Sequence, residues 1–267
     1  MLIRLAMKLT ELSPRFKRFL WRRWYQYLAG YQLRDWRFMN YGLALKEEPA
    51  LRLDPTDEPN RSSIQLYHRV ASAIPLAGLE VLEVGCGRGG GASYVKRYHR
   101  PRQLTGVDFS AKAIRFCQAN YHVEGLSFAQ GDAESLPFAE ESFDAVLNVE
   151  SSHCYGSMPA FLGQVQRVLR PGGHFLFADL RVAKDLPRLH AQLLASGLTI
   201  LESEDLTEGV LAALRGDSER KLALIEKSVP KRLLPAFRQF AALEGSETYE
   251  AFRTRAMVYV RYVMRAG

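Results

Sequence analysis

The sequence predicts an α/β protein built around a doubly wound, mostly parallel β-sheet. Two observations predict it: short β-type runs alternate with stretches of helical periodicity, and a glycine-rich loop follows directly after the first run. Strands that alternate with helices imply crossover connections, which join parallel neighbours. The runs occupy residues 80–85, 103–108, 126–130, 143–148, 173–179, 198–203 and 256–264. We therefore expect a seven-stranded sheet within one large domain covering residues 61–267.

The segments outside this alternating pattern are expected to be helical. Residues 1–60 are predicted to form an N-terminal helical cap, because leucines recur at helical spacing in the first twelve residues and aromatic residues continue the pattern. A further helix is expected near 61–74, where apolar residues share one face. The long interval before the last β-type run predicts a helical insertion at about 206–243.

The composition is that of a globular protein, with 47% hydrophobic and 24% charged residues, which excludes whole-chain disorder and fibrous architectures. The formal net charge is +7, and ten basic residues lie in the first 50 positions. This basic and amphipathic N-terminus, residues 1–25 above all, favours either packing on the domain or peripheral contact with an anionic membrane. Three widely spaced cysteines fit a reducing cytoplasm. No apolar run approaches the roughly 18 residues that a spanning helix needs.

The glycine-rich loop, Glu83-Val84-Gly85-Cys86-Gly87-Arg88-Gly89-Gly90-Gly91, carries the strongest functional signal. Glycines let the backbone turn sharply and approach a ligand closely, at the point where open α/β sheets bind cofactors. Three acids at strand ends indicate which cofactor. Glu83 would repel a pyrophosphate but helps to hold a cation, Asp108 suits ribose hydroxyls, and Asp132 suits the amino group of adenine. An S-adenosyl ligand has a sulfonium, an amine and no phosphate, so this pattern favours it over NAD.

Five segments in order, LEVGCGRGGG, GVDFS, GDAESLPF, FDAVLNVESSHCY and VLRPGGHFLFADL, resemble the successive motifs of class I S-adenosylmethionine-dependent methyltransferases. The resemblance implies a Rossmann-like doubly wound sheet with an antiparallel last strand, S-adenosyl-L-methionine as cofactor and S-adenosyl-L-homocysteine as product. Carried over by position, Glu83, Gly85 and Gly87 would line the methionine portion and Asp108 the ribose. Phe109 would cover an adenine face, and Asp132 with the Ala133 backbone would meet the adenine edge.

Three further residues are expected to belong to this cofactor site. Cys86 is the small residue inside the glycine loop, and Asn148 opens the NVESSHCY segment after the fourth β-type run. Tyr41 precedes the core, where related enzymes often close over the methionine end with an aromatic residue. For Tyr41 the alternative is ordinary packing in the cap.

A closer resemblance extends beyond the core motifs. DEPNR (57–61), LYHRV (66–70), GRGGGASY (87–94), NVESSHCY and ADLR (178–181) are similar to a bacterial subfamily. It includes the mycobacterial phthiotriolone/phenolphthiotriolone dimycocerosate methyltransferases, fatty-acid O-methyltransferases and the microcystin O-methyltransferase. The resemblance implies methylation of a hydroxyl group on a hydrophobic lipid, polyketide or peptide.

A neutral hydroxyl group needs a base to become a nucleophile, and His153 in the NVESSHCY segment is the candidate. Glu150 either orients His153 or is itself the base. The expected activity rises with pH near the ordinary imidazole pKa of about 6.5. No cluster of histidines and acids has metal-ligand spacing, so a metal-free reaction is expected. The alternatives are an N- or C-methyltransferase on a similar scaffold and, from another class, a nucleic-acid-binding or RNA-modifying protein that uses the basic N-terminus.

Overall fold

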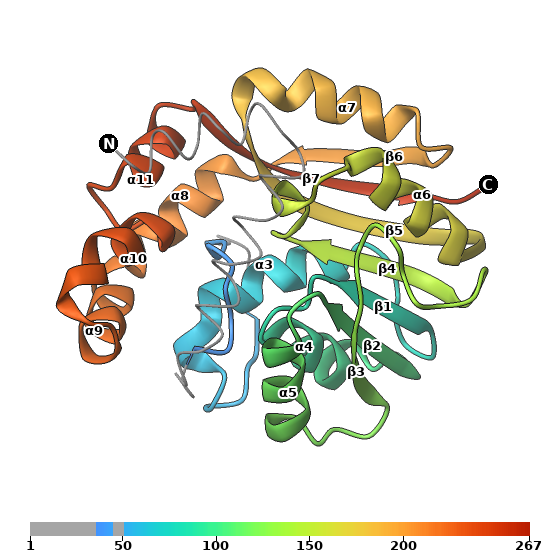
Figure 1. The fold of residues 1–267 in the computed structure, drawn as a ribbon, viewed down its shortest axis with the longest axis horizontal. Helices are drawn as coiled ribbons and strands as arrows, with labels where there is room; N and C mark the ends of the chain where they lie inside the picture. Colours follow the sequence, from blue (N-terminus) through green and yellow to red (C-terminus); the bar gives the residue numbers. More distant parts are fainter. Residues whose placement is uncertain (1–35, 45–50) are drawn as a thin grey trace.

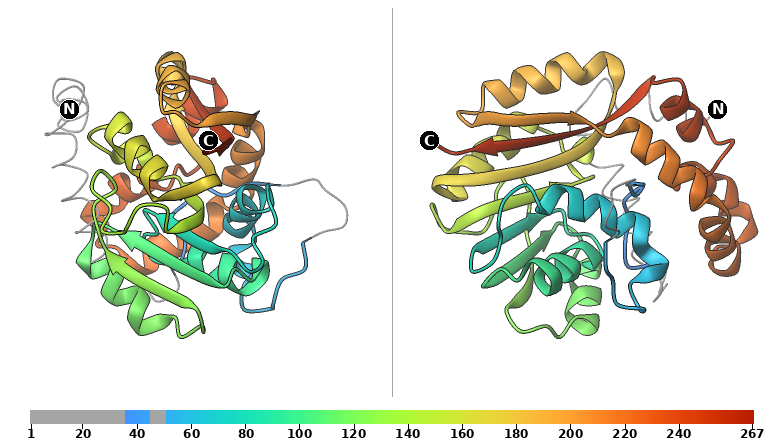
Figure 2. Two further views of the ribbon diagram at one scale, coloured as in Figure 1. Left: turned by 90° about the vertical axis from the view of Figure 1, so that its right-hand side faces the viewer. Right: turned by 180° about the vertical axis from the view of Figure 1, so that it is seen from behind.

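The computed structural model describes residues 36–44 and 51–267, and these contain a seven-stranded sheet with the order β3-β2-β1-β4-β5-β7-β6 (Figure 1). The strands are β1 Glu80–Val84, β2 Gln103–Asp108, β3 Leu126–Gln130, β4 Phe143–Val149, β5 Leu169–Val182, β6 Thr199–Asp205 and β7 Met257–Arg265. Strands β1 to β5 pair in parallel, and β7 is antiparallel to both β5 and β6. The view from behind shows β7, coloured red, within the sheet (Figure 2, right). The predicted fold class and the antiparallel last strand are confirmed.

Helices cover both faces of the sheet. They are α3 Arg61–Ala71, α4 Gly90–His99, α5 Ala111–Asn120, α6 Met158–Val168, α7 Leu186–Leu194, α8 Thr207–Gly216, α9 Ser218–Ser228, α10 Leu234–Phe240 and α11 Glu247–Arg253. Successive side chains of a strand point to opposite faces. In β4, Leu147 therefore joins the core beneath α3, α4 and α5, while Val146 joins the core beneath α6 and α7.

The insertion before the last strand is larger than the sequence predicts. Helices α8 to α11 run from Thr207 to Arg253, so a further helix, α11, follows the predicted limit of 243. Helices α8 and α11 pack beside β7, whereas α9 and α10 enclose a third apolar cluster around Ile225 and Phe237. Figure 1 shows this helical pair at the end of the molecule, away from the sheet.

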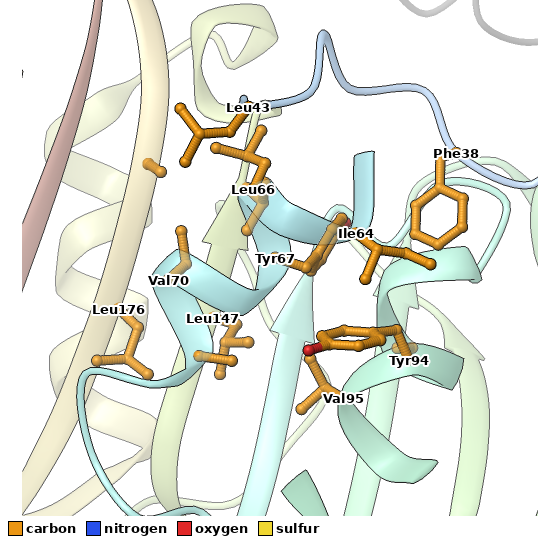
Figure 3. Close-up of a cluster of buried hydrophobic side chains, with 14 of the residues drawn as sticks. Phe38, Leu43, Ile64, Leu66, Tyr67, Val70, Tyr94, Val95, Leu147 and Leu176 are labelled. Carbon is orange, nitrogen blue, oxygen red and sulfur yellow. The ribbon is translucent and has the colours of Figure 1, made fainter. Parts of the chain in front are cut away.

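Residues 36–44 form an extended segment, called the strap here, that crosses the carboxyl-end edge of the sheet. Leu43 N donates to Ser62 O over 2.8 Å, and Gly90 N donates to Arg37 O over 3.2 Å. Phe38 and Leu43 are buried against the α3 core (Figure 3). The strap therefore ties the start of the described chain to α3 and to the glycine loop.

The N-terminal predictions are only partly covered by the structure. The described stretches 36–44 and 51–57 contain no helix, and the short 3-10 helix η1 spans Glu58–Asn60. The helical cap expected over residues 1–35 and the membrane contact expected for 1–25 lie outside the described residues. Within the described ranges, no helix combines the length and apolar character that crossing a bilayer demands.

Candidate active site

The glycine loop after β1 is held against β2 by backbone and carboxylate hydrogen bonds. Gly85 N donates to Val107 O over 2.8 Å, and Gly87 N donates to Asp108 Oδ2 over 2.9 Å. Gly85 has φ of +79°, and a Cβ atom there would lie 2.4 Å from Ser151 Oγ. Both the conformation and the close approach therefore require glycine. The other oxygen of Asp108 accepts from Ser110 N at 2.8 Å, and burial raises the pKa of this carboxyl group.

A cavity of about 1470 Å³, including its open mouth, lies at the carboxyl ends of β1 to β4. It is called the cofactor cavity here. Most of the sequence-predicted cofactor residues line it: Gly85, Cys86, Gly87, Asp108, Phe109, Asp132 and Ala133. Glu150, the second candidate base, lines it as well. The structure thus brings together residues from four separate segments of the sequence, as expected of an open α/β sheet.

Two predicted cofactor residues lie behind the wall of this cavity. Glu83 is 1% exposed, and its Oε1 accepts from the hydroxyl group of Tyr67 at 2.7 Å. Its Oε2 has no hydrogen-bond partner among the described residues, and burial raises the pKa of Glu83 to about 7. Asn148 is fully buried and donates through Nδ2 to Val84 O at 2.9 Å and to Ser151 Oγ at 2.8 Å. Asn148 thus supports the chain at the start of the glycine loop, whereas Glu83 is held by Tyr67 of α3.

Tyr41 is tied to Glu150 and does not line the cofactor cavity. Its backbone N–H donates to Glu150 Oε2 over 2.9 Å, and its carbonyl oxygen accepts from Lys221 Nζ at 3.2 Å. Glu150 has a positive φ of 52°, which is uncommon for a residue with a side chain. Burial raises the pKa of Glu150 to about 8. The predicted contact between Tyr41 and the cofactor stays a prediction.

His153, whose side chain is 16% exposed, forms an ion pair with the fully buried Asp179, a residue that the sequence motifs do not single out. Asp179 Oδ1 lies 2.8 Å from His153 Nδ1, and Asp179 Oδ2 accepts from His153 N at 2.9 Å and from Ser152 Oγ at 2.6 Å. Asp179 is fully buried and also pairs with Arg181. Its place at the end of the predicted 173–179 run could have marked it as a site residue, because the carboxyl ends of parallel strands meet at the same edge of the sheet.

The pair fixes the charges of both partners. Burial alone would lower the pKa of His153, but Cys154 and Asp179 outweigh burial and raise it to about 10. Burial opposes ionisation of Asp179, but His153 and Arg181 outweigh it and hold its pKa well below the ordinary range. His153 itself does not line the cofactor cavity, whereas its neighbour Cys154 does.

The charges around the cofactor cavity fit S-adenosylmethionine, which carries a sulfonium, an ammonium and one carboxylate. Four carboxyl groups and two guanidinium groups line the cavity, namely those of Asp108, Asp132, Glu134, Glu150, Arg37 and Arg88. The excess of acids suits a cation, and the unpartnered Glu83 Oε2 is a further acceptor behind the wall. Within residues 36–44 and 51–267, no three His, Cys, Asp or Glu side chains gather as metal ligands would.

This sheet order, the glycine loop after β1, the acid that ends β2 and the acid after β3 define a class I S-adenosylmethionine-dependent methyltransferase. Residues 82–177 match the family model described as a methyltransferase domain. The chain is 41% identical over 230 residues to the phthiotriol/phenolphthiotriol dimycocerosates methyltransferase of Mycobacterium leprae, covering 85% of each protein. It is 39% identical over 225 residues to the fatty-acid O-methyltransferase of Mycolicibacterium smegmatis, covering 84% of this chain and 81% of that one. The chain belongs to the methyltransferase family that contains these enzymes.

Solved structures show the same fold at low sequence identity. The cyclase SpnF has a TM-score of 0.71 and 22% identity, over 91% of this chain and 94% of that one. A geranyl diphosphate methyltransferase in complex with SAM has a TM-score of 0.61 and 18% identity, over 86% of this chain and 99% of that one. These structures share the fold of this chain. Its membership of the family and the lining of the cofactor cavity make the protein a methyltransferase whose cofactor is S-adenosyl-L-methionine.

Proposed function

We propose that the protein methylates a hydroxyl group of a hydrophobic lipid, polyketide or peptide. The observation that carries this proposal is the pair of His153, just after the end of β4, and the buried Asp179 of β5. S-adenosylmethionine supplies a methyl group on a positively charged sulfur. A neutral hydroxyl group is a weak nucleophile unless a base removes its proton, so a histidine held by a buried carboxylate suits this acceptor.

The pair also determines which nitrogen of His153 would act. Asp179 stays ionised because its pKa is held low, so it accepts a hydrogen bond and Nδ1 carries the proton. The neutral ring then has its basic lone pair on Nε2. In this mechanism Nε2 takes the proton of the acceptor hydroxyl. Because the pKa of His153 is about 10, only a small fraction of the enzyme holds the neutral ring near neutral pH.

Glu150 is the second candidate for the base. It lines the cofactor cavity while His153 does not, and its pKa of about 8 is close to physiological pH. Its hydrogen bond to Tyr41 N uses Oε2. The two candidates differ in their pH dependence and in which single substitution is the more damaging.

The hydrophobic acceptor is supported by the lining of the cavity and by the relatives. Trp36, Phe38 and Met39 of the strap add large apolar side chains to the wall. The relatives are named as methyltransferases of dimycocerosates and of fatty acids. An amine acceptor, as in an N-methyltransferase, would need no protein base once it is neutral. A C-methyltransferase would act on carbon, and an RNA-modifying role has no separate support in the described residues.

The test is to incubate the enzyme with methyl-labelled cofactor and a set of long-chain alcohols, with the matching amines as comparison. The proposal predicts labelled methyl ethers and little labelled amine, measured by mass spectrometry. Preferred labelling of the amines would place the N-methyl alternative ahead.

A further inference from the structure

Lys221 lies on helix α9 of the insertion and reaches across to the strap. Its Nζ donates to Tyr41 O at 3.2 Å and lies 3.8 Å from Asp217 Oδ2. The side chain is only 14% exposed, and burial lowers the pKa of its ammonium group. A buried ammonium group is costly unless hydrogen-bond and charged partners hold it. The bond from Lys221 therefore fixes the backbone of Tyr41 against the insertion.

Two further contacts tie this part of the strap to the insertion. Ala44 N donates to Gly209 O of helix α8 at 3.0 Å. The ring of Tyr41 packs edge-on against Phe252 of helix α11, with ring centroids 5.6 Å apart. Helices α8, α9 and α11 thus all contact the strap near Tyr41, so the insertion determines where the Tyr41 backbone lies.

The same residue of the strap holds Glu150. Tyr41 N donates to Glu150 Oε2 over 2.9 Å, while Tyr41 O accepts from Lys221. The backbone of Glu150 is itself fixed, since its N–H donates to Ala178 O at 2.8 Å. A free glutamate side chain samples many rotamers, and the bond from Tyr41 N selects one position of its carboxyl group. Lys221 is therefore connected to Glu150 through a single strap residue.

Glu150 lies at the methionine end of the cofactor cavity. It lines the cavity, and the next residue, Ser151, approaches the glycine loop so closely that a Cβ atom at Gly85 would lie 2.4 Å from its Oγ. The motifs assign Gly85 to the methionine portion of the cofactor, which carries the sulfonium. They assign Asp108 and Asp132 to the ribose and the adenine instead. A carboxylate at the position of Glu150 attracts the positive sulfur.

We propose that Lys221 is a positioning residue that, through the backbone of Tyr41, holds the Glu150 carboxylate where it attracts the sulfonium of S-adenosylmethionine. The inference concerns the cofactor and not the acceptor, so it stands for either candidate base. It also gives the helical insertion a role in cofactor binding, although α9 contributes no residue to the cofactor cavity.

The charge on Glu150 depends on groups from every element around it. Among the described residues, the titratable and charged groups that act on it or are affected by it come from the strap, α3, the segment after β4, β5, α9 and β7: Tyr41, Tyr67, His153, Asp179, Lys221 and Tyr259. Burial raises the pKa of Glu150 to about 8, whereas the Tyr41 N–H, His153 and Lys221 act to lower it. Loss of Lys221 removes one positive charge and loosens Tyr41. Both changes raise the pKa of Glu150.

The test compares the binding of S-adenosylmethionine and S-adenosylhomocysteine by calorimetry, without an acceptor, over a pH series that spans the pKa of Glu150. The two ligands share their amine and carboxylate and differ in the charge on sulfur, so the ratio of their dissociation constants measures attraction to the sulfonium. In the wild type the ratio should shift about tenfold towards S-adenosylmethionine as pH rises and level off near pH 8. Glu150→Gln should remove this shift except for any part due to Glu83, whose pKa is about 7.

Lys221→Met should move the pH at which the ratio levels off upward by about 1 unit, the lower end of what one nearby opposite charge does to a carboxyl pKa. Lys221→Arg keeps the charge and the donor and should restore the wild-type profile. Lys227→Met is the matched control, because Lys227 is exposed on the same helix. A purely structural role of Lys221 would lower the unfolding temperature and leave the profile in place.

Lys221→Gln is neutral but polar and is measured alongside, in case the methionine variant does not fold; the same upward movement is expected. A wild-type profile in either folded neutral variant, or an undiminished shift in Glu150→Gln, would overturn the proposal. Because no acceptor is present, these results do not depend on whether the enzyme methylates a hydroxyl group.

Discussion

His153 Nδ1 lies 2.8 Å from Asp179 Oδ1, where His153 follows β4 and Asp179 lies in the neighbouring parallel strand β5. The buried carboxylate also accepts from the backbone N–H of His153, so both the ring and its backbone are fixed. A buried charge is tolerated only when it is paired and hydrogen-bonded. The two hydrogen bonds therefore fix the orientation of the histidine.

Removal of the imidazole is expected to lower the catalytic rate. His153→Ala should reduce kcat by roughly 10²–10⁴-fold with cofactor affinity little changed, the usual effect of losing a positioned base. The measurement is steady-state kinetics on the true acceptor together with calorimetry of S-adenosylhomocysteine. His174→Ala is the control, because His174 lies nearer the start of β5. A variant within about threefold of the wild type would exclude the base assignment.

The pH dependence of kcat separates the two candidate bases. If His153 is the base, activity rises with pH and levels only near pH 10, because the ring must be neutral to accept a proton. This is well above the ordinary imidazole range that the sequence alone suggests. If Glu150 is the base, activity levels above about pH 8 and Glu150→Gln is the more damaged variant.

Stability should depend on pH through the same pair. The folded-state pKa of His153 is raised, so the pair contributes fully below the ordinary pKa of 6.5 and its contribution disappears as pH rises through about 10. Urea unfolding of the wild type and His153→Gln should therefore differ most near pH 6 and converge at alkaline pH. A difference that grows with pH would contradict the raised pKa.

Alanine substitutions at Gly91 and at Gly163 should have opposite effects on the stability of the fold. A Cβ atom at Gly91 would lie 1.9 Å from the ring of Tyr67, which donates to Glu83, whereas a Cβ atom at Gly163 meets nothing within 4 Å. Gly91→Ala should destabilise the fold by about 1–3 kcal/mol and weaken cofactor binding. Gly163→Ala, within helix α6, should stabilise by about 0.5–1 kcal/mol. Thermal and urea unfolding check both, and a neutral Gly91→Ala would argue against the tight packing beneath the loop.

Cofactor affinity should depend on Asp108. Asp108→Ala removes the acceptor of Gly87 N and the carboxylate assigned to the ribose. The loss of one charge-assisted hydrogen bond weakens the free energy of cofactor binding by about 1.5–3 kcal/mol. The dissociation constant of S-adenosylhomocysteine should rise roughly tenfold to a hundredfold. Asp144→Ala is a matched control, because this acid lies near the opposite end of the sheet, where it pairs with Arg170. Equal weakening by both variants would indicate a general loss of structure.

Much of this architecture was predictable from local pattern. Each of the seven β-type runs became a strand, because alternating or continuous apolar residues and flanking turns carry that information within a few positions. The glycine loop and the acids at 108 and 132 were predictable for the same reason, since each lies at or just beyond the end of a strand.

What the sequence could not predict depends on contacts between distant segments. Asp179 can be identified as the partner of His153 only once the pairing of β4 with β5 is known, because this pairing brings the two residues together. The strap residues Trp36 to Asn40 reach the cofactor cavity because the strap is held by α3 and the glycine loop. The backbone of Tyr41, whose contact with the cofactor stays a prediction, is tied to Glu150 and Lys221. No local periodicity encodes these contacts.

The most direct test of the central claim is the fate of an isotope-labelled methyl group from S-adenosylmethionine. Wild-type enzyme is incubated with a long-chain alcohol, and the product is analysed by mass spectrometry and by nuclear magnetic resonance of the labelled carbon. The account predicts a label bound to oxygen in a methyl ether, with the yield falling at least a hundredfold in His153→Ala. A label bound to nitrogen or carbon, or an ether yield that His153→Ala leaves unchanged, would contradict it.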